Sequence, residues 1–231
     1  MPEIRDLLDT LSVWLLPVLV AITFHEAAHG WMAERLGDDT ARRLGRVTFN
    51  PLAHVDPVGT LLLPGLLVLF DAPFVFGWAK PVPVAFHRLR HPKRDMVWVA
   101  LAGPAINILL ALGCGFAYHG VAALPDPWSG WVADNLANAI AINVVLATFN
   151  MVPIPPLDGG RVVVGLLPRP WSWRFARLER YGMLILLLLL FLVPVIARQL
   201  GYTVNPLATV LWPVVSLVYD LVLLATGWPT G

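Results

Sequence analysis

The chain has 231 residues, of which 58% are hydrophobic and 13% charged, and its formal net charge at pH 7 is +1. Its mean hydropathy of +0.71 is above that of ordinary soluble domains and predicts a polytopic membrane protein. The small net charge gives no basis for nucleic-acid binding, because the basic residues gather in a few connecting loops. The single cysteine, Cys114, excludes an internal disulfide and a cysteine-based metal site.

Six apolar runs divide the sequence, each close to the roughly 20 residues that span hydrocarbon. They cover residues 11–36, 58–78, 96–119, 130–152, 182–197 and 206–226. We expect the first run to be a retained helix and not a signal peptide, because the residues before it are more acidic than basic. No internal repeat or Gly/Ser-rich linker interrupts the sequence, so we predict one membrane domain over residues 1–231.

The first run contains ionisable residues where lipid normally excludes them, in the sequence His25-Glu26-Ala27-Ala28-His29. Residues four apart share one helix face, so His25 and His29 can bind one metal ion while Glu26 reaches a water molecule beside it. Two core histidines and a snorkelling glutamate are the alternative, but three unpaired ionisable groups at membrane depth would cost several kcal/mol. The spacing is typical of zinc-dependent hydrolysis.

The basic loops predict how the chain crosses the membrane, because short cytoplasmic loops are enriched in lysine and arginine. The loops on both sides of the second run are basic, whereas residues 119–130 contain no lysine or arginine. We therefore expect residues 58–78, which several glycines and prolines interrupt, to be re-entrant; two tilted crossings are the alternative. This topology places the N-terminus outside and His25 nearer the cytoplasmic end of its helix.

Two short segments beside the second run have strand-like or extended sequences. Residues 44–49 contain β-branched and aromatic side chains, and prolines bias residues 78–84 toward an extended backbone. Either segment could be an edge that holds a substrate extended, or a short interfacial hairpin could close a cavity. His54 and Asp56 offer too few ligands for a second metal site, and an interfacial turn explains them better. The expected fold is all-α, with about five to six transmembrane helices, a re-entrant segment and a small β-hairpin.

A hydrolytic zinc site usually has three protein ligands, so the two histidines need a partner from elsewhere in the chain. Asp158 is the best candidate, because the prolines before it and the two glycines after it cannot form a regular helix. Unwound backbone at membrane depth is tolerated where it lines a polar cavity. An ordinary interfacial Asp-Gly turn is the alternative. Glu179, a glutamate that could serve as a different third ligand, lies among arginines and suits a surface ion pair better.

Three motifs, taken in this order, resemble the site-two protease family of intramembrane zinc metalloproteases. They are His-Glu-x-x-His in the first helix, Gly103-Pro104-Ala105-Ile106-Asn107 in a later one, and Asn150-x-x-Pro-x-Pro-x-Leu-Asp158-Gly. The similarity covers about residues 20–165 and includes residues 77–84. The chain is most similar to compact prokaryotic members that lack an inserted PDZ domain.

The resemblance implies that His25, His29 and Asp158 bind one Zn²⁺ per chain and that Glu26 is the catalytic acid/base. It implies a catalytic core at about residues 11–165, followed by C-terminal helices at about 182–226. The substrate would be a transmembrane protein, cut in the lipid bilayer of a prokaryotic inner membrane, with the active site nearer the cytoplasmic side.

Two asparagines are candidates for stabilising the oxyanion of a tetrahedral intermediate, because a carboxamide donates two hydrogens without adding charge. They are Asn107 and Asn150, and an interhelical hydrogen bond is the alternative role for each. The alternative function for the whole chain is a membrane protein that binds or transports zinc without hydrolysis. Such a protein has no need for a carboxylate at position 26.

Overall fold

The computed structural model describes residues 2–70, 77–201 and 206–228 of the chain. These residues form helices joined by turns and irregular segments, and none of them forms a β-strand. The longest helices are α1 (Pro2–Arg35), α4 (Pro92–Tyr118), α5 (Trp128–Asn150) and α10 (Pro206–Thr226). The shorter α-helices are α2 (Thr40–Arg43), α3 (Leu63–Leu69), α6 (Asp158–Leu166), α7 (Arg169–Ala176), α8 (Gly182–Leu187) and α9 (Val193–Gln199). Short 3-10 and π-helical segments are η1 (Pro51–His54), η2 (Pro57–Leu62), η3 (Phe86–Arg88), η4 (Val121–Ala123), η5 (Arg177–Tyr181) and η6 (Leu188–Leu192).

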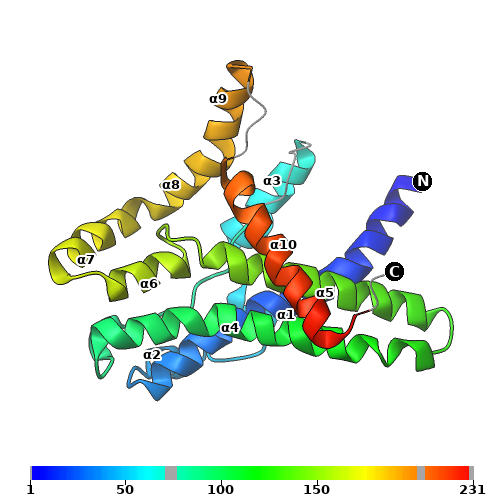
Figure 1. The fold of residues 1–231 in the computed structure, drawn as a ribbon, viewed down its shortest axis with the longest axis horizontal. Helices are drawn as coiled ribbons and strands as arrows, with labels where there is room; N and C mark the ends of the chain where they lie inside the picture. The colour runs from blue at the N-terminus through cyan, green and yellow to red at the C-terminus, as the bar shows by residue number, and fades with distance from the viewer. Residues whose placement is uncertain (1, 71–76, 202–205, 229–231) are drawn as a thin grey trace.

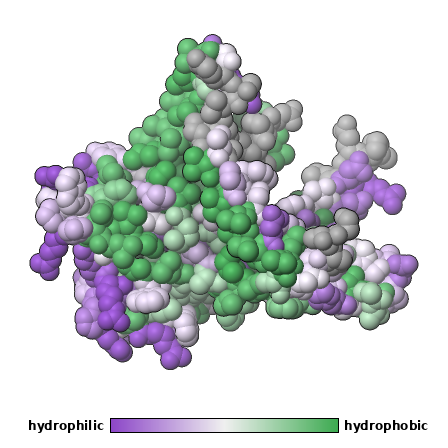
Figure 2. All heavy atoms as spheres, in the orientation of Figure 1, coloured by the Kyte–Doolittle hydropathy of each residue, from purple (hydrophilic) through white to green (hydrophobic). Residues whose placement is uncertain are grey.

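Five helical segments are long and apolar enough to cross a membrane. They are Leu8–Arg35, Pro92–Tyr118, Trp128–Asn150, Glu179–Gln199 and Thr209–Thr226. Figure 2 shows hydrophobic residues over the middle of the molecule and hydrophilic residues gathered toward opposite ends of the long helices. The chain is therefore an integral membrane protein, and the all-α prediction is confirmed.

The core of the protein is a layer of three helices with a fourth across it (Figure 1). Helices α1, α4 and α5 pack against one another, and α10 packs across α4 and α5. Ala111, Ile140 and Val222, one from each of α4, α5 and α10, are buried where these helices meet. At Gly115 of α4 a Cβ atom would lie 2.6 Å from the side chain of Thr226, so this close helix contact requires a glycine.

The second apolar run does not form a long helix. Its described part consists of η2 and α3, which together cover Pro57–Leu69, too few residues for a span. Residues 71–76 of this run lie outside the described residues, and the structure does not support the re-entrant prediction as such. It shows that the run begins and ends at one place, because the N–H of Trp78 donates to the carbonyl of Gly59 at 3.0 Å.

The predicted β-hairpin is wrong, because neither residues 44–49 nor residues 78–84 form a strand. Gly45 has a φ of +65°, which turns the chain at the start of the first segment. Two prolines remove ladder donors from the second segment. The N–H groups of Trp78 and Lys80 donate to carbonyls of η2 and η1, and that of Val82 donates to a side chain of α1, so none of the three is available for a neighbouring strand. Prolines that bias a backbone toward an extended conformation also deprive it of a strand's hydrogen bonds.

The chain after α1 is tied to the segment that precedes α4. Gly37, with a φ of +113°, ends the helix, and Asp38 behind it is completely buried. Its carboxylate accepts hydrogen bonds from the backbone N–H of Thr40 at 3.1 Å and of Ala85 at 2.6 Å. The bond from Ala85 holds the segment before α4 beside the end of α1.

Candidate metal centre

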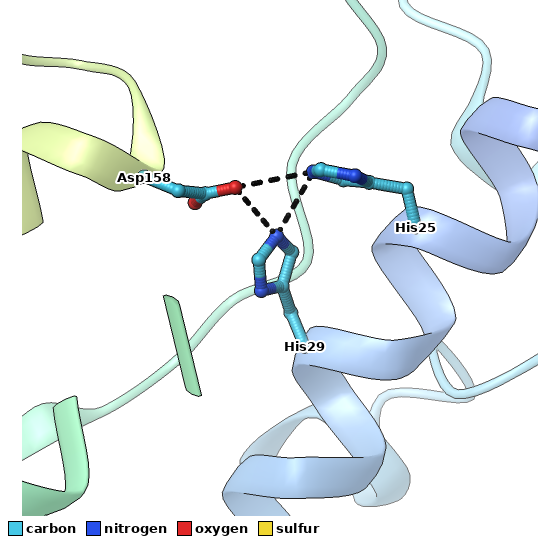
Figure 3. A group of neighbouring side chains, drawn as sticks. All are labelled: His25, His29 and Asp158. Carbon is cyan, nitrogen blue, oxygen red and sulfur yellow. Dashed lines mark hydrogen bonds and ion pairs between the residues drawn. The ribbon is translucent and has the colours of Figure 1, made fainter. Parts of the chain in front are cut away.

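Three buried side chains from distant parts of the sequence meet beside α1 (Figure 3). The Nε2 atoms of His25 and His29, one helical turn apart, are separated by 3.1 Å. The Oδ2 atom of Asp158, the first residue of α6, lies 3.2 Å from each of them. One ligand atom from each of these three residues lies close enough to the others to hold a metal ion. Among the described residues, no other group of three or more His, Cys, Asp or Glu side chains does so.

The second ring nitrogen of each histidine determines which atoms face the centre. Nδ1 of His25 lies 2.6 Å from Oδ1 of Asn107, and Nδ1 of His29 lies 2.7 Å from the carbonyl of Val99. Both partners are acceptors, so each Nδ1 carries the hydrogen and each Nε2 presents a lone pair. When both rings are neutral, neither Nε2 carries a hydrogen, so two nitrogen lone pairs and a carboxylate oxygen face one another.

This donor set fits a zinc ion. Oδ2 of Asp158 is buried and accepts no hydrogen bond, which is costly unless a cation lies beside it. Burial disfavours the charged form of Asp158, whereas a positive charge on the adjacent imidazoles, when these are protonated, lowers the pKa of its carboxyl. Beside neutral imidazoles, a bound cation would have to supply that positive charge. Two imidazole nitrogens and one carboxylate oxygen form a ligand set of catalytic zinc sites.

Helix α4 approaches the centre through a glycine. A Cβ atom at Gly103 would lie 2.5 Å from Nε2 of His29 and 2.7 Å from Nε2 of His25. Both distances are shorter than a van der Waals contact, so any side chain at this position would occupy the space in front of the ligand atoms. Gly103 begins the Gly-Pro-Ala-Ile-Asn motif, and the site explains why this position is a glycine.

The loop before Asp158 has the irregular backbone that its prolines predict. Helix α5 ends at Asn150, and residues 151–157 form turns before α6 begins at Asp158. Two glycines let α6 start against this loop: a Cβ at Gly159 would lie 2.2 Å from the carbonyl oxygen of Met151, and one at Gly160 would lie 2.7 Å from the nitrogen of Pro155. The loop and the glycines together place Asp158 opposite the two histidines.

Glu26 follows the first histidine on α1 and is held by a backbone donor. Its Oε2 atom accepts a hydrogen bond of 2.7 Å from the N–H of Val82, in the segment that follows the second apolar run. Glu26 lines the same cavity as His25 and His29. The carboxylate is therefore oriented at the edge of the metal centre.

The centre opens into a large cavity of about 1330 Å³. Most of its lining is apolar, and one wall is formed by α8, η6 and α9. The residues of this wall that line the cavity include Met183, Leu186, Leu190 and Pro194, spaced so that they share one helix face. The cavity thus joins the buried ligands to an apolar surface of a membrane-spanning segment.

Asn107 contacts the site but has no hydrogen left to donate. Its Oδ1 accepts the hydrogen of His25 Nδ1, and its Nδ2 donates to the carbonyl of Ala21 at 3.1 Å and to Oδ1 of Asn143 at 2.7 Å. Asn143, buried on α5, was not among the sequence candidates, although an asparagine in an apolar run was a signal for it. These contacts orient His25.

Asn150 has a different environment. Its Nδ2 donates to the carbonyl of Leu146 at 2.9 Å, which uses one of its two hydrogens, and its side chain lines the cavity with the metal centre. The second amide hydrogen remains for another acceptor.

The remaining sequence candidates have structural contacts. Nε2–H of His54 donates to the carbonyl of Thr48 at 3.1 Å. Oδ1 of Asp56 accepts from the N–H groups of Val58 and Gly59 and caps η2, in agreement with the interpretation as a turn. Glu179 lies on the surface, 3.4 Å from Arg161, as expected for an ion pair.

The fold and the site define a class of protein. A helical membrane protein with a buried His-His-Asp centre and an adjacent glutamate has the residues that a metal-dependent hydrolase needs. Comparison with known proteins identifies the family. The sequence profile of Peptidase family M50 matches residues 128–193, which include Asn150 and Asp158.

Relatives match over most of the chain. A Bacillus subtilis protein named "Putative zinc metalloprotease YwhC" is 34% identical over 223 residues, which make up 94% of this chain and 91% of that protein. A protein of Mycolicibacterium smegmatis named "Putative zinc metalloprotease Rip2" is 30% identical over 189 residues, 79% of this chain and 69% of its own length. No solved structure matches the chain significantly.

The chain belongs to Peptidase family M50, the site-two protease family, and is an intramembrane zinc metalloprotease. The resemblance inferred from the sequence motifs is confirmed. A zinc-binding protein without hydrolytic activity is not favoured, because the relatives are named as metalloproteases.

Proposed function

We propose that His25, His29 and Asp158 hold the zinc ion of this protease and that Glu26 is its catalytic acid/base, in the cleavage of peptide bonds within or next to the transmembrane helices of protein substrates. One observation carries this proposal: the three residues with buried ligand atoms also line a cavity whose walls are mainly apolar side chains. The apolar side chains of a transmembrane segment match such a wall without leaving charged groups buried and unpaired.

The residues around the centre have separate tasks in this reaction. Zinc bound there supplies a water molecule of lowered pKa and polarises the peptide carbonyl. Glu26 takes up the proton of the attacking water and then donates it to the leaving amine nitrogen. The Val82 N–H holds Oε2, which leaves Oε1 for this proton. Asp158 keeps its charge and remains a ligand throughout.

The two asparagines take different roles in this proposal. Asn150, with one free amide hydrogen in the cavity, is the candidate donor to the tetrahedral oxyanion. Asn107 is a positioning residue, because its oxygen fixes the tautomer and the ring orientation of His25. Of the two asparagines that the sequence offers as oxyanion donors, we therefore propose Asn150 alone for this role.

Alanine at each asparagine position is expected to separate these roles. Asn150→Ala should retain zinc and lower kcat about a hundredfold, because one oxyanion donor is lost. Asn107→Ala should weaken zinc affinity about tenfold or more, because the hydrogen of His25 Nδ1 loses its acceptor. Zinc titration of the metal-depleted protein and single-substrate kinetics measure both effects. Equal zinc affinity and equal kcat in the two variants would contradict the assignment.

The placement of the site in the membrane is also a proposal. We place the active site nearer the cytoplasmic side of a prokaryotic inner membrane, with the N-terminus outside. His25 is about 15 Å from the end of α1 at Arg35, at 1.5 Å per residue. The arginines of α2 and α7 lie at this end, where Figure 2 shows hydrophilic residues, and basic residues favour the cytoplasmic face. On this topology residues 58–78 enter and leave on one face.

The chain is proposed to form one domain, with a catalytic core at about residues 11–165 and C-terminal helices at about 182–226. The support is structural continuity: α10 packs on α4 and α5, and the residues that line the cavity come from both parts. Loss of the C-terminal helices would remove one wall of the substrate cavity.

Metal removal tests the proposed function directly. Protein purified in detergent should contain about one zinc per chain and should cleave some members of a panel of single-span membrane proteins. Chelation should abolish cleavage, and added Zn²⁺ should restore it, because the proposed reaction needs the ion to activate the attacking water and to polarise the peptide carbonyl. Zinc content by elemental analysis and product formation on gels are the readouts. Cleavage that persists after complete removal of zinc would sink the proposal.

A further inference from the structure

One peptide group lies between the catalytic carboxylate and an arginine outside the membrane-spanning helices. The N–H of Val82 donates to Oε2 of Glu26 at 2.7 Å. Nη2 of Arg46 lies 2.8 Å from the carbonyl oxygen of Lys80 and 3.4 Å from that of Pro81. Since Pro81 C=O and Val82 N–H belong to the same peptide group, Arg46 and Glu26 contact its two ends.

We propose that Arg46 is a positioning residue of the protease, which orients the general base Glu26 through the peptide group of Pro81 and Val82. This inference rests on the proposed role of Glu26. Neither the metal ligands nor the bound substrate needs to contact Arg46 for it to affect turnover.

The sequence of the segment makes Val82 a specific donor. Residues 81 and 83 are prolines, so Val82 carries the only backbone N–H between Lys80 and Val84. Val82 is 7% exposed, and its side chain packs near Gly30 of α1. The single available donor of this stretch is thus directed at Glu26.

The neighbouring hydrogen bonds fix the chain on either side of this peptide group. Lys80 N–H donates to the carbonyl of His54 at 2.8 Å, and Ala85 N–H donates to Oδ2 of Asp38 at 2.6 Å. Between these two points, Arg46 binds the carbonyl side of the backbone and Glu26 binds the amide side.

The charges on the two sides reinforce each other. A guanidinium group near a peptide carbonyl polarises the peptide group and strengthens donation from its N–H to a carboxylate. The strengthened bond restricts the rotation of Glu26 and keeps its second oxygen in a fixed position for proton transfer. Loss of Arg46 should therefore lower the rate of the chemical step more than it weakens substrate binding.

The first test uses kinetics and zinc content. Arg46→Ala is expected to lower kcat about tenfold with KM and zinc content unchanged, and Arg46→Lys should recover part of the loss, because a lysine can also donate to these carbonyls. Arg42→Ala is the control, since Arg42 of the nearby helix α2 pairs with Glu34 at the surface. Wild-type kcat in Arg46→Ala, or a loss of kcat that only accompanies lost zinc, would overturn the proposal.

The second test detects the hydrogen bond between Val82 and Glu26 without measuring cleavage. Hydrogen–deuterium exchange of the Val82 amide, followed by NMR, reports this bond, and protection there should fall in Arg46→Ala and in Glu26→Ala. Val82→Pro removes the donor, so its kcat should fall about tenfold below that of Val82→Ala, and Arg46→Ala should add little to it. Full additivity, or no protection at Val82 in the wild type, would contradict the inference. Wild-type cleavage by Glu26→Gln would instead overturn the proposed role of Glu26 itself.

Discussion

Replacing Glu26 with glutamine is expected to lower the rate of peptide cleavage by about a thousandfold and to leave zinc binding intact. Glutamine has nearly the same shape, and its amide oxygen can still accept the hydrogen bond from Val82 N–H. It cannot take up the proton of the attacking water or return it to the leaving amine. The zinc ligands His25, His29 and Asp158 are unchanged, so metal content and catalysis should separate. Zinc analysis and cleavage of a single-span substrate in detergent provide the measurement.

A matched control lies on the same helix. Glu34 of α1 pairs with Arg42 at the surface, at 2.7 Å, and has no contact with the metal centre among its described hydrogen bonds. Glu34→Gln removes the same charge and should retain wild-type cleavage, because exposed pairs contribute little to stability. A Glu26→Gln variant that cleaves at the rate of Glu34→Gln would show that proton transfer does not pass through position 26.

The three proposed zinc ligands could be predicted from the sequence, the histidines from their own spacing and Asp158 because two histidines need a third ligand. Two histidines four residues apart share a helix face whatever surrounds the helix. Asp158 was marked by the prolines before it, and the structure has turns at residues 151–157. The expectation that Gly159 and Gly160 would also interrupt the helix is wrong, because both lie in the first turn of α6, where a side chain would clash with the preceding loop. The five candidate spans were also predictable, because apolar length is a property of the sequence alone.

The contacts around these ligands depended on information that the sequence does not carry. The sequence does not tell whether an asparagine in a transmembrane helix faces an oxyanion or a histidine ring. Only the structure shows that Asn107 donates both amide hydrogens, to Ala21 and to Asn143. Residues 78–84 have an extended composition, but their partners decide whether an extended segment becomes a strand. Here the partners are turns, an arginine and a carboxylate.

Arg46 illustrates the same difficulty at longer range. In the sequence it is one of several basic residues in a loop, and charge alone assigns it to the membrane interface. Its approach to the carbonyl of Lys80 follows from the way the chain returns beside α1. Sequence patterns report the preferences of one residue, whereas this contact joins residues 34 positions apart.

Replacing Gly103 with alanine is expected to weaken zinc binding at least about tenfold and to reduce cleavage in parallel. The added Cβ would lie 2.5 Å from Nε2 of His29, well inside a van der Waals contact. The rings cannot move away at low cost, because His25 is held by Asn107 and His29 by the carbonyl of Val99. Either a ring leaves its hydrogen bond or α4 shifts away from α1, and both changes separate the ligand atoms. Zinc titration of the metal-depleted variant measures the effect.

Gly113 provides the matched control, because it lies on the same helix and a Cβ there would meet no atom within 4 Å. Alanine favours a helix over glycine by about 1 kcal/mol, so both variants gain the same helix propensity and differ only in what the new methyl group meets. Gly113→Ala should bind zinc and cleave substrate as the wild type does. Wild-type zinc affinity in Gly103→Ala would mean that α4 lies farther from the histidines than the structure has it. Equal losses in both variants would point to the helix backbone and not to the space in front of the ligands.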